Sequence, residues 1–524
     1  MVGKHLRHIA LAAVSLAPFA GLPAVPLRAQ PSGDAARCAA LAQAVWPGLE
    51  VTVTNLLPAA PAGTLRINAN SSDTFQFSLP GNCRVEGIID RRAGAGGVEY
   101  GLRFALALPA DWNGRLLFQG GGGWNGSLGP PFGFERSGNP ALARGFAVLA
   151  TDGGHRNTGN PLAFFADQQA SLDFAFNAVP TVTRLAQYLA AQYYGRAPHH
   201  TYSYGCSTGG REGMLAAQRS PLLFDGVIAG APAMQPWNSQ LAGWNAEVAF
   251  ARIAPRDADG KRLVRQAFSA ADERLLHTAV ARQCDALDGL ADGYVHNLKA
   301  CRFDPGVLQC SGAKTGSCLS GGQVEALRTA FGGARDGLGN LVTSGFPWDL
   351  ALLGQSVGNA ASVLPSSVPT QFGLWPEPFS VDSVIEEVRN HPLENLSETS
   401  RWTNLSTFHA RYGKILFYHG AADAWFSIND TIDYAERLAA ANPGADFSRF
   451  YAVPGMGHCN GGGTDIFDLL GPLVEWVEQG KAPQTIVATS TVEPGLSRPL
   501  CAWPQYAHYK GGDPKAAASF ECRS

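Results

Sequence analysis

Charged side chains are scarce in this sequence, and the two signs nearly cancel. Lys and Arg number 40, Asp and Glu number 43, and together they make up 16% of the 524 residues. The usual share in soluble domains is about 25%. The formal net charge of −3 argues against the basic surface that binds nucleic acid or an anionic membrane. We therefore expect no nucleic-acid partner and no membrane partner.

Long apolar runs are also lacking after the first 29 residues, which argues against a later membrane-spanning helix. Residues 1–29 begin with Lys4 and Arg7, continue with an apolar stretch, and carry small residues near Ala24 and Ala29. This pattern is typical of a secretory signal, and its three prolines disfavour the alternative of a membrane anchor. We expect a signal peptide over 1–29 and a secreted or periplasmic protein.

Glycine and proline, by contrast, are frequent, at 61 and 34 residues. Short apolar runs that end in glycine or a polar turn predict six buried strands: 115–123, 145–154, 200–207, 226–232, 414–420 and 448–458. The segments between them predict four helices: 171–194, 209–219, 429–441 and 464–479. Such alternation predicts a mostly parallel sheet covered on both faces. Reactive groups collect at the carboxyl ends of the strands in sheets of this kind.

The stretch GCSTGGREG, residues 205–213, contains the pattern G-x-S-x-G. Ser207 follows a predicted strand and precedes a predicted helix, and Gly205 and Gly209 leave room for a tight turn. This context favours an exposed nucleophilic serine over an ordinary glycine-serine turn.

A serine nucleophile needs a base and a residue that orients the base. His458 closes the last predicted strand, and Asp423 follows the strand before it. The chain order Ser, Asp, His is the one expected on this kind of sheet. Asp430 and Asp433 are weaker alternatives to Asp423, because they fall on the helix that follows.

The glycine run QGGGGWNG, residues 119–126, follows an early strand. Its backbone N–H groups, at Gly121 and Gly122, can stabilise an oxyanion together with the N–H of Thr208. A phosphate-binding loop is disfavoured, because its Lys and Ser/Thr are missing.

Ten cysteines predict disulfides in an exported chain. Neighbouring cysteines suggest the pairs 284–301, 310–318 and 501–522, although sequence alone does not fix connectivity. Cys206 precedes Ser207 and Cys459 follows His458, so contact between serine and histidine brings these cysteines within the span of about 6 Å that a disulfide bridges. Cys38 and Cys83 then remain as the fifth pair.

The paired motifs Cys-Ser and His-Cys, the intervening Asp and the glycine run resemble those of the secreted tannase and feruloyl esterase family. The resemblance covers nearly the whole mature chain. It implies an α/β class, an α/β-hydrolase fold with a large disulfide-rich lid insertion. The core is then expected at 30–232 and 405–524, where the strand-helix alternation holds. The lid, with a calcium loop, is expected at 233–404, where the alternation breaks.

The segment CDALDGLADGYVHNLKAC, residues 284–301, carries three aspartates on one tight loop. Hard oxygen ligands at this density suit Ca²⁺, although the spacing is not that of an EF-hand. The alternative is a solvated acidic loop. By the family resemblance, a structural calcium ion is bound by the side chains of Asp285, Asp288 and Asp292 and the carbonyls of Leu290 and Tyr294.

Aromatic residues cluster near the predicted site and in the insertion. Trp425 and Phe426 lie just past Asp423, and His419 is a further candidate for substrate contact. The insertion adds Trp237, Trp244, Trp348, Phe372 and Trp375, for most of which a place in the lid core is the better interpretation. An aromatic acyl group between lid and core fits this composition.

We therefore expect a serine carboxylic ester hydrolase that acts on small aromatic acid esters (feruloyl, galloyl or related) through an acyl-enzyme. Hydrolysis of a terephthalate monoester is the alternative within the family. A peptidase, an aliphatic lipase and a non-catalytic binding protein on a hydrolase scaffold are further alternatives. The intact Ser207, Asp423 and His458 count against a non-catalytic protein. The sequence does not indicate the oligomeric state.

Overall fold

The computed structural model describes residues 33–524 apart from 44, 47, 61–62, 71–72, 134–135, 137, 158, 354–362 and 365–378. The predicted signal, Phe372 and Trp375 lie outside the described residues. Across the described ranges, no helix combines the length and the apolar character that crossing a membrane requires.

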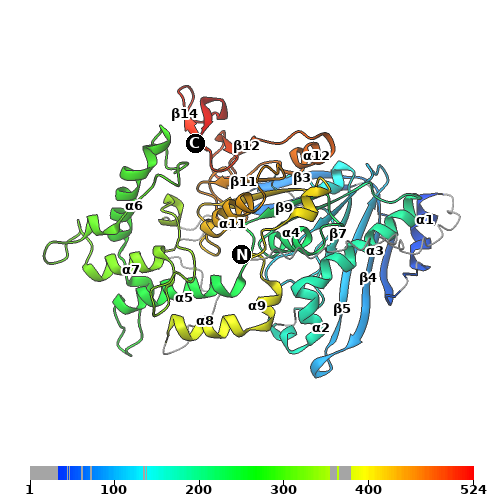
Figure 1. Cartoon of the computed structure of the whole chain (residues 1–524), viewed down its shortest axis with the longest axis horizontal. Helices are drawn as coiled ribbons and strands as arrows, with labels where there is room; N and C mark the ends of the chain where they lie inside the picture. The colour runs from blue at the N-terminus through cyan, green and yellow to red at the C-terminus, as the bar shows by residue number, and fades with distance from the viewer. Residues whose placement is uncertain are drawn as a thin grey trace, which may run out of the picture.

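The centre of the molecule is a sheet in which nine strands are described (Figure 1). In spatial order they are β1 (Val51–Ala60), β4 (Asn82–Ala93), β5 (Glu99–Pro109), β7 (Ala147–Thr151), β6 (Arg115–Gln119), β8 (His200–Cys206), β9 (Gly226–Gly230), β10 (Lys414–Gly420) and β11 (Ser448–Val453). The pairs from β1 to β7 are antiparallel, and those from β7 to β11 are parallel. The six predicted strands are confirmed, and the sheet is mostly parallel as expected.

Helices cover both faces of the sheet because alternate strand residues point to opposite sides. Phe118 of β6 belongs to the core under α3 (Ala178–Tyr194), α4 (Thr208–Arg219) and α11 (Ile428–Ala441). Its neighbour Leu117 belongs to the opposite core, together with Leu473 and Trp476 of α12 (Leu470–Gln479). The short α1 (Asp34–Ala40) packs at the antiparallel edge.

Two of the predicted helices differ in extent from the structure. The segment predicted at 171–194 is divided into α2 (Gln168–Leu172), a π-helical turn (Asp173–Asn177) and α3. The helix predicted from 464 begins only at Leu470. Asp465 is fully buried and accepts hydrogen bonds from Gly461 and Thr491, which holds this stretch in a non-helical path.

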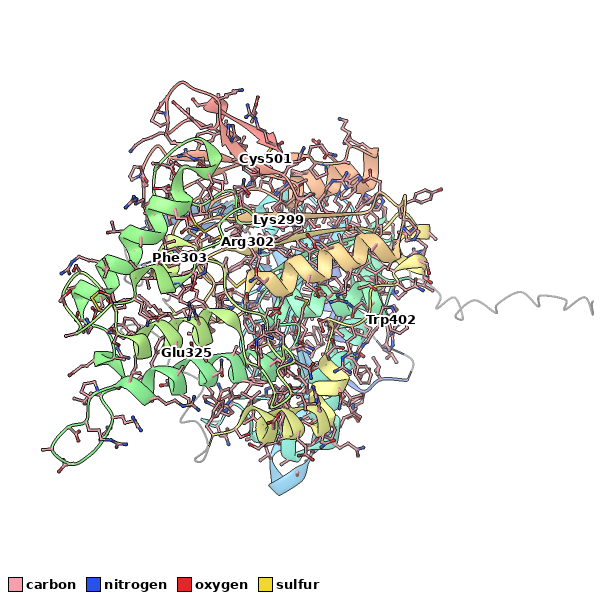
Figure 2. All side chains as sticks on the ribbon, turned by 60° about the vertical axis from the view of Figure 1, so that its left-hand side comes forward. Lys299, Arg302, Phe303, Glu325, Trp402 and Cys501 are labelled. Atoms are coloured by element: carbon pink, nitrogen blue, oxygen red, sulfur yellow. A yellow bond between two sulfur atoms is a disulfide. The ribbon has the colours of Figure 1, made fainter. Side chains whose placement is uncertain are left out.

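The described part of the segment 233–404 consists of helices joined by loops. It contains α5 (Pro236–Ile253), α6 (Ala270–Cys284), α7 (Gly321–Gly332), α8 (Val381–Asn390) and α9 (Pro392–Ser397), and α10 (Ser406–Ala410) leads back to β10. Its own core includes Phe303 and also takes in Ala422, beside Asp423. Figure 2 shows Phe303 and Glu325 within this helical part of the molecule. The insertion thus packs directly on the turn that follows β10.

Three two-stranded sheets complete the described strands: β2 (Gly63–Asn70) with β3 (Asp73–Leu79), β12 (Thr485–Thr489) with β13 (Ser497–Cys501), and β14 (Tyr506–Tyr509) with β15 (Phe520–Arg523). All ten cysteines are paired as predicted: Cys38–Cys83, Cys206–Cys459, Cys284–Cys301, Cys310–Cys318 and Cys501–Cys522.

Glu478 joins α12 to two strands of the sheet. Its carboxylate accepts hydrogen bonds from the Arg115 guanidinium at 2.7 and 2.6 Å and from the Tyr202 hydroxyl at 2.7 Å. Burial raises the pKa of Glu478, but the hydrogen bonds from Arg115 and Tyr202 and the charge of Arg115 outweigh burial and hold that pKa at about 2.

We predict that Glu478→Gln destabilises the protein by on the order of 2 kcal/mol at neutral pH, because hydrogen bonds to a charged group are lost. The folded pKa lies below the ordinary value of 4.5. The loss of stability relative to wild type therefore has its full size above that pH and disappears as the pH falls toward about 2. Melting temperatures measured from pH 7 downward test this. Glu475→Gln, exposed on the same helix, is the control, and equal behaviour of the two variants would contradict the assignment.

Candidate active site

Ser207 lies on a strained turn between β8 and α4. Its backbone has φ 63° and ψ −124°, a conformation that is costly for a residue with a side chain. A Cβ on Gly205 would come within 2.5 Å of the Gly209 backbone, and one on Gly209 within 2.7 Å of the Gly121 carbonyl oxygen. The glycines are therefore required by close backbone approach, as expected for a nucleophile elbow.

Asp423 and His458 are hydrogen-bonded at the ends of β10 and β11. His458 Nδ1 lies 2.7 Å from Asp423 Oδ2, and Asp423 is 1% exposed. The other oxygen, Oδ1, accepts hydrogen bonds from the N–H groups of Trp425 and Phe426, at 2.9 and 3.0 Å. Burial raises the pKa of Asp423, but the charge of His458 and the hydrogen bonds from nearby histidines outweigh it and hold that pKa well below its usual range.

The interpretation of His419 as a substrate contact was wrong. Its imidazole is fully buried, with Nε2 at 3.2 Å from Asp423 Oδ2 and 3.0 Å from the Phe426 carbonyl oxygen, and Nδ1 at 2.8 Å from Thr431 Oγ1. Two acceptors at Nε2 place a proton there. His419 therefore supports Asp423 from behind, away from the cavity that contains Ser207.

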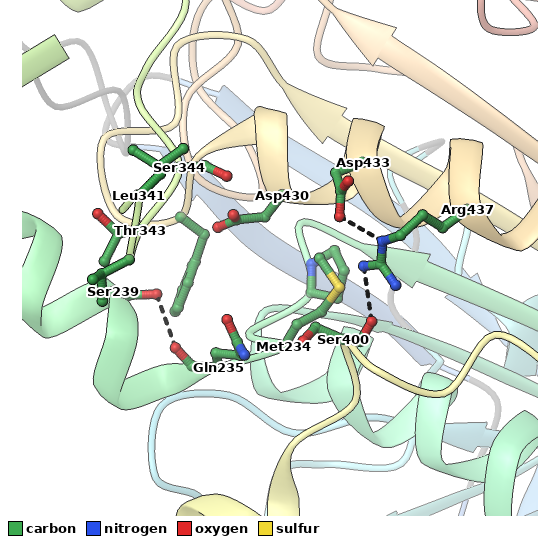
Figure 3. A pocket seen from close by; sticks show the side chains of 13 residues that line it. Met234, Gln235, Ser239, Leu341, Thr343, Ser344, Ser400, Asp430, Asp433 and Arg437 are labelled. Atoms are coloured by element: carbon green, nitrogen blue, oxygen red, sulfur yellow. Dashed lines mark hydrogen bonds and ion pairs between the residues drawn. The ribbon is translucent and has the colours of Figure 1, made fainter. Parts of the chain in front are cut away.

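The alternatives to Asp423 lie elsewhere. Asp430 and Asp433 are on α11 and line a neighbouring cavity (Figure 3). Asp433 forms an ion pair with Arg437 at 2.7 Å. The structure thus brings Asp423, and not these two residues, to His458.

A disulfide joins the two loops that carry Ser207 and His458. The Cα atoms of Cys206 and Cys459 are 5.9 Å apart, although 253 positions separate them in the chain. The sheet alone places the ends of β8 and β11 near each other. The disulfide therefore fixes the position of the Ser207 loop relative to the His458 loop.

The glycine loop, residues 120–126 after β6, lies against the start of α4. Thr208 is the first residue of α4, and N–H groups in the first turn of a helix lack intrahelical partners. Gly122 borders open space. The expectation for Gly121 needs correction, because its N–H donates to the Glu212 carboxylate at 2.8 Å. Gly122 and Thr208 remain the candidate oxyanion donors.

A cavity of about 230 Å³ opens beside Ser207. Trp425 and Phe426 line it as predicted, and the Trp425 ring stacks on the His458 imidazole with centroids 5.2 Å apart. Sequence reasoning missed Trp124 and Phe174, which also line this cavity. Trp124 was visible inside the glycine run, whereas nothing in the sequence marked Phe174.

The aromatic candidates from the insertion that the structure describes, Trp237, Trp244 and Trp348, do not line this cavity. Trp348 stacks on Phe331 within the insertion core, at 4.0 Å. Trp237 packs edge-on against Trp124, at 4.8 Å, and so supports the cavity wall from behind. Trp244 packs against a small apolar cluster of the insertion.

The acidic loop folds around Asp285, Asp288 and Asp292. Asp285 accepts hydrogen bonds from the N–H groups of Asp292 and Gly293, at 3.1 and 3.0 Å. Burial, aided by the negative charges of Asp292 and Asp285, raises the pKa of Asp288 to about 7. Three carboxylates on one short loop are donors of the type that Ca²⁺ prefers.

Two further observations concern this loop. Arg498, which is 2% exposed, forms an ion pair with Asp292. In the part of the chain that the structure describes, three ligand atoms within 4.8 Å of one another occur at His199, His200 and Glu478, and not at the aspartates. The donor chemistry fits calcium, and closure of the loop around an ion stays a prediction.

The sheet, the elbow serine and the Asp423–His458 pair define an α/β-hydrolase. The model of the family described as "Tannase and feruloyl esterase" matches residues 83–361 and 379–523. The chain therefore belongs to the tannase and feruloyl esterase family and is a carboxylic ester hydrolase.

Curated relatives agree with this assignment. The chain is 39% identical over 567 aligned residues to a mono(2-hydroxyethyl) terephthalate hydrolase of Piscinibacter sakaiensis, covering 94% of this chain and 92% of the relative. It is 30% identical to a probable feruloyl esterase of Arthroderma benhamiae, covering 80% and 81%. The crystal structure of feruloyl esterase B from Aspergillus oryzae has the same fold, with a TM-score of 0.73 at 24% identity, covering 94% of this chain and 100% of that one.

We predict that the double variant Cys206→Ser with Cys459→Ser loses activity before it loses its fold. A displacement of about 1 Å between reacting groups can cost on the order of a hundredfold in rate. Ester hydrolysis and circular dichroism, measured at the same temperatures, test this. The double variant Cys310→Ser with Cys318→Ser removes a disulfide of the insertion and should keep activity. Equal losses of activity in both double variants would contradict a role for the 206–459 bond in catalysis.

Proposed function

We propose that this protein hydrolyses small esters of aromatic carboxylic acids through an acyl-enzyme on Ser207, with His458 as the base and Asp423 as its orienting partner. The observation that carries the proposal is the shared cavity. Ser207, Trp425 and Phe426 line one space of about 230 Å³, and the His458 ring lies against Trp425. Its aromatic walls and its size suit a single planar ring.

In the proposed acylation step, Ser207 Oγ attacks the ester carbonyl while His458 Nε2 takes the serine proton. Asp423 at Nδ1 fixes the tautomer that leaves Nε2 free to accept, and it stabilises the imidazolium that forms. The N–H groups of Gly122 and Thr208 would hydrogen-bond the oxyanion. His458 then passes its proton to the leaving alcohol as the carbon–oxygen bond breaks.

In the proposed deacylation step, water takes the place of the alcohol. His458 removes a proton from the water, which attacks the acyl carbonyl and releases the carboxylic acid from Ser207. The proton returns to Ser207 through the same imidazole, so the free enzyme is regenerated.

Hydrolysis of a terephthalate monoester is the second candidate. The specific observation in its favour is the 39% identity to a mono(2-hydroxyethyl) terephthalate hydrolase over nearly the whole chain. An aromatic monoester of that kind carries the same planar ring as a feruloyl or galloyl ester. A substrate panel separates these possibilities.

We also infer that the acidic loop binds one structural calcium ion and that the chain is exported. For calcium, the support is the set of three carboxylates, with the carbonyls of Leu290 and Tyr294 as the remaining predicted ligands. A Cβ on Gly455, in the loop before His458, would lie 2.8 Å from the Tyr294 ring. An ordered acidic loop would therefore support the histidine loop. For export, the support is the signal-like sequence and the five disulfides.

We predict that Ser207→Ala lowers kcat on aromatic esters by about three orders of magnitude or more, because the nucleophile is lost. Methyl ferulate, methyl gallate and mono(2-hydroxyethyl) terephthalate are the substrates to compare. Ser220→Ala, at the other end of α4, is the control and should keep wild-type rates. Near-wild-type turnover by Ser207→Ala would falsify the nucleophile, and wild-type protein that prefers aliphatic esters would contradict the substrate class.

We predict that purified protein holds one calcium ion and that a chelator lowers its melting temperature. A ligand that binds only the folded state stabilises it by about 2.7 kcal/mol at a hundredfold excess over Kd. Asp288→Asn should lose both the ion and the chelator response, whereas Asp336→Asn, in an exposed turn, should keep both. Metal analysis and thermal melts test this, and calcium-free protein that does not respond to added calcium would exclude the site.

A further inference from the structure

Glu212 is a buried carboxylate that contacts the glycine loop. It lies on α4, five residues after Ser207, and it is 3% exposed. Its Oε2 accepts the Gly121 N–H at 2.8 Å, and its Oε1 accepts the side-chain amide of Asn125 at 2.7 Å. One carboxylate therefore binds both ends of the segment that contains Gly122.

The segment between these two contacts has little freedom. Asn125 adopts a positive φ of 52°, and its N–H donates to the Gly122 carbonyl at 2.9 Å. A Cβ on Gly121 would come within 2.7 Å of Asn125 Oδ1. The Thr208 hydroxyl donates to the Gly123 carbonyl. The turn at Gly122 is thus tied to the first turns of α4, which directly follow the serine.

Glu212 has no ion-pair partner among the described residues. The neighbouring Arg211 points its guanidinium to the carbonyls of Phe174 and Ala175, at 3.3 and 3.5 Å, and over the Phe174 ring. A buried carboxylate is costly unless hydrogen bonds compensate it. Burial raises the pKa of Glu212, and the hydrogen bond from Gly121, the charge of Arg211 and the hydrogen bond from Asn125 oppose that rise. The hydrogen bonds come from the glycine loop, so the contact holds the loop and the carboxylate in place together.

We propose that Glu212 is a positioning residue for oxyanion stabilisation: it fixes the glycine loop so that the Gly122 N–H faces the carbonyl oxygen of an ester at Ser207. This inference rests on the proposed function. Glu212 acts through Gly121 and Asn125 and does not touch the substrate. An oxyanion donor acts mainly in the transition state, so its displacement lowers kcat with little effect on KM.

The first test is Glu212→Ala, which leaves the Gly121 N–H and the Asn125 amide without their acceptor. We expect kcat for methyl ferulate to fall about a hundredfold or more, with KM within about threefold of wild type. Inhibition by benzeneboronic acid, which forms a tetrahedral adduct with a serine, should weaken in parallel with kcat/KM. Glu394→Gln, another buried carboxylate, is the control and should change stability without a comparable loss of kcat.

The second test exchanges the carboxylate of Glu212 and the side-chain amide of Asn125. Asn125→Asp places two carboxylates face to face and should reduce kcat about as much as Glu212→Ala. Combining it with Glu212→Gln restores both hydrogen bonds. The glutamine oxygen accepts the Gly121 N–H, and the glutamine amide donates to the carboxylate introduced at position 125. Asn125 Oδ1 has no partner in the structure, so the double variant leaves no additional group unpaired. Its kcat should return to within about tenfold of wild type, since the loop regains its position.

The outcomes distinguish failure of the proposed function from failure of the proposed role of Glu212. Wild-type protein that neither hydrolyses aromatic esters nor reacts with a fluorophosphonate at Ser207 contradicts the proposed function, and this inference falls with it. An active wild type whose Glu212→Ala variant stays within about threefold in kcat overturns the role of Glu212 alone. If Glu212→Ala does not fold, the exchange decides: recovery in the double variant supports the role, and absence of recovery overturns it.

Discussion

The strained backbone at Ser207 is the constraint on which the rest of the site depends. A positive φ at a residue with a side chain persists only when its surroundings enforce it. Here the surroundings are backbone atoms: a Cβ on Gly210 would lie 2.4 Å from the Gly230 carbonyl oxygen, and one on Gly120 would lie 2.6 Å from Gly209 Cα. Strands β6, β8 and β9 therefore converge on α4 without intervening side chains. The same convergence places the glycine loop against the serine.

Residues far apart in the chain meet because parallel strands end at one edge of the sheet. β8 leads to Ser207, β10 leads to Asp423, and β11 leads to His458. The sheet brings these ends near one another, and side chains complete the alignment. His419 holds Asp423 from behind, and the Cys206–Cys459 disulfide ties the serine loop to the histidine loop.

The strands and the order of Ser207, Asp423 and His458 were predictable because buried parallel strands are apolar runs with distinctive ends. Cys206 and Cys459 were predictable because each adjoins a residue of the site. The role of His419 was not predictable, because a side chain at a strand end can face either the cavity or the interior. The contact with Thr431 determines that His419 faces the interior. The direction of the Gly121 N–H depends on Glu212, which looked like an ordinary helix residue. The start of α12 depends on contacts of Asp465 that only the folded chain makes.

The measurement that tests the central claim most directly is capture of the acyl-enzyme. Wild-type protein mixed with p-nitrophenyl ferulate and quenched in acid within milliseconds should carry one feruloyl group. Peptide mapping should place that group on Ser207, because an ester at the elbow serine precedes hydrolysis in the proposed sequence. A feruloyl group on another residue, or none during rapid turnover, would contradict the account.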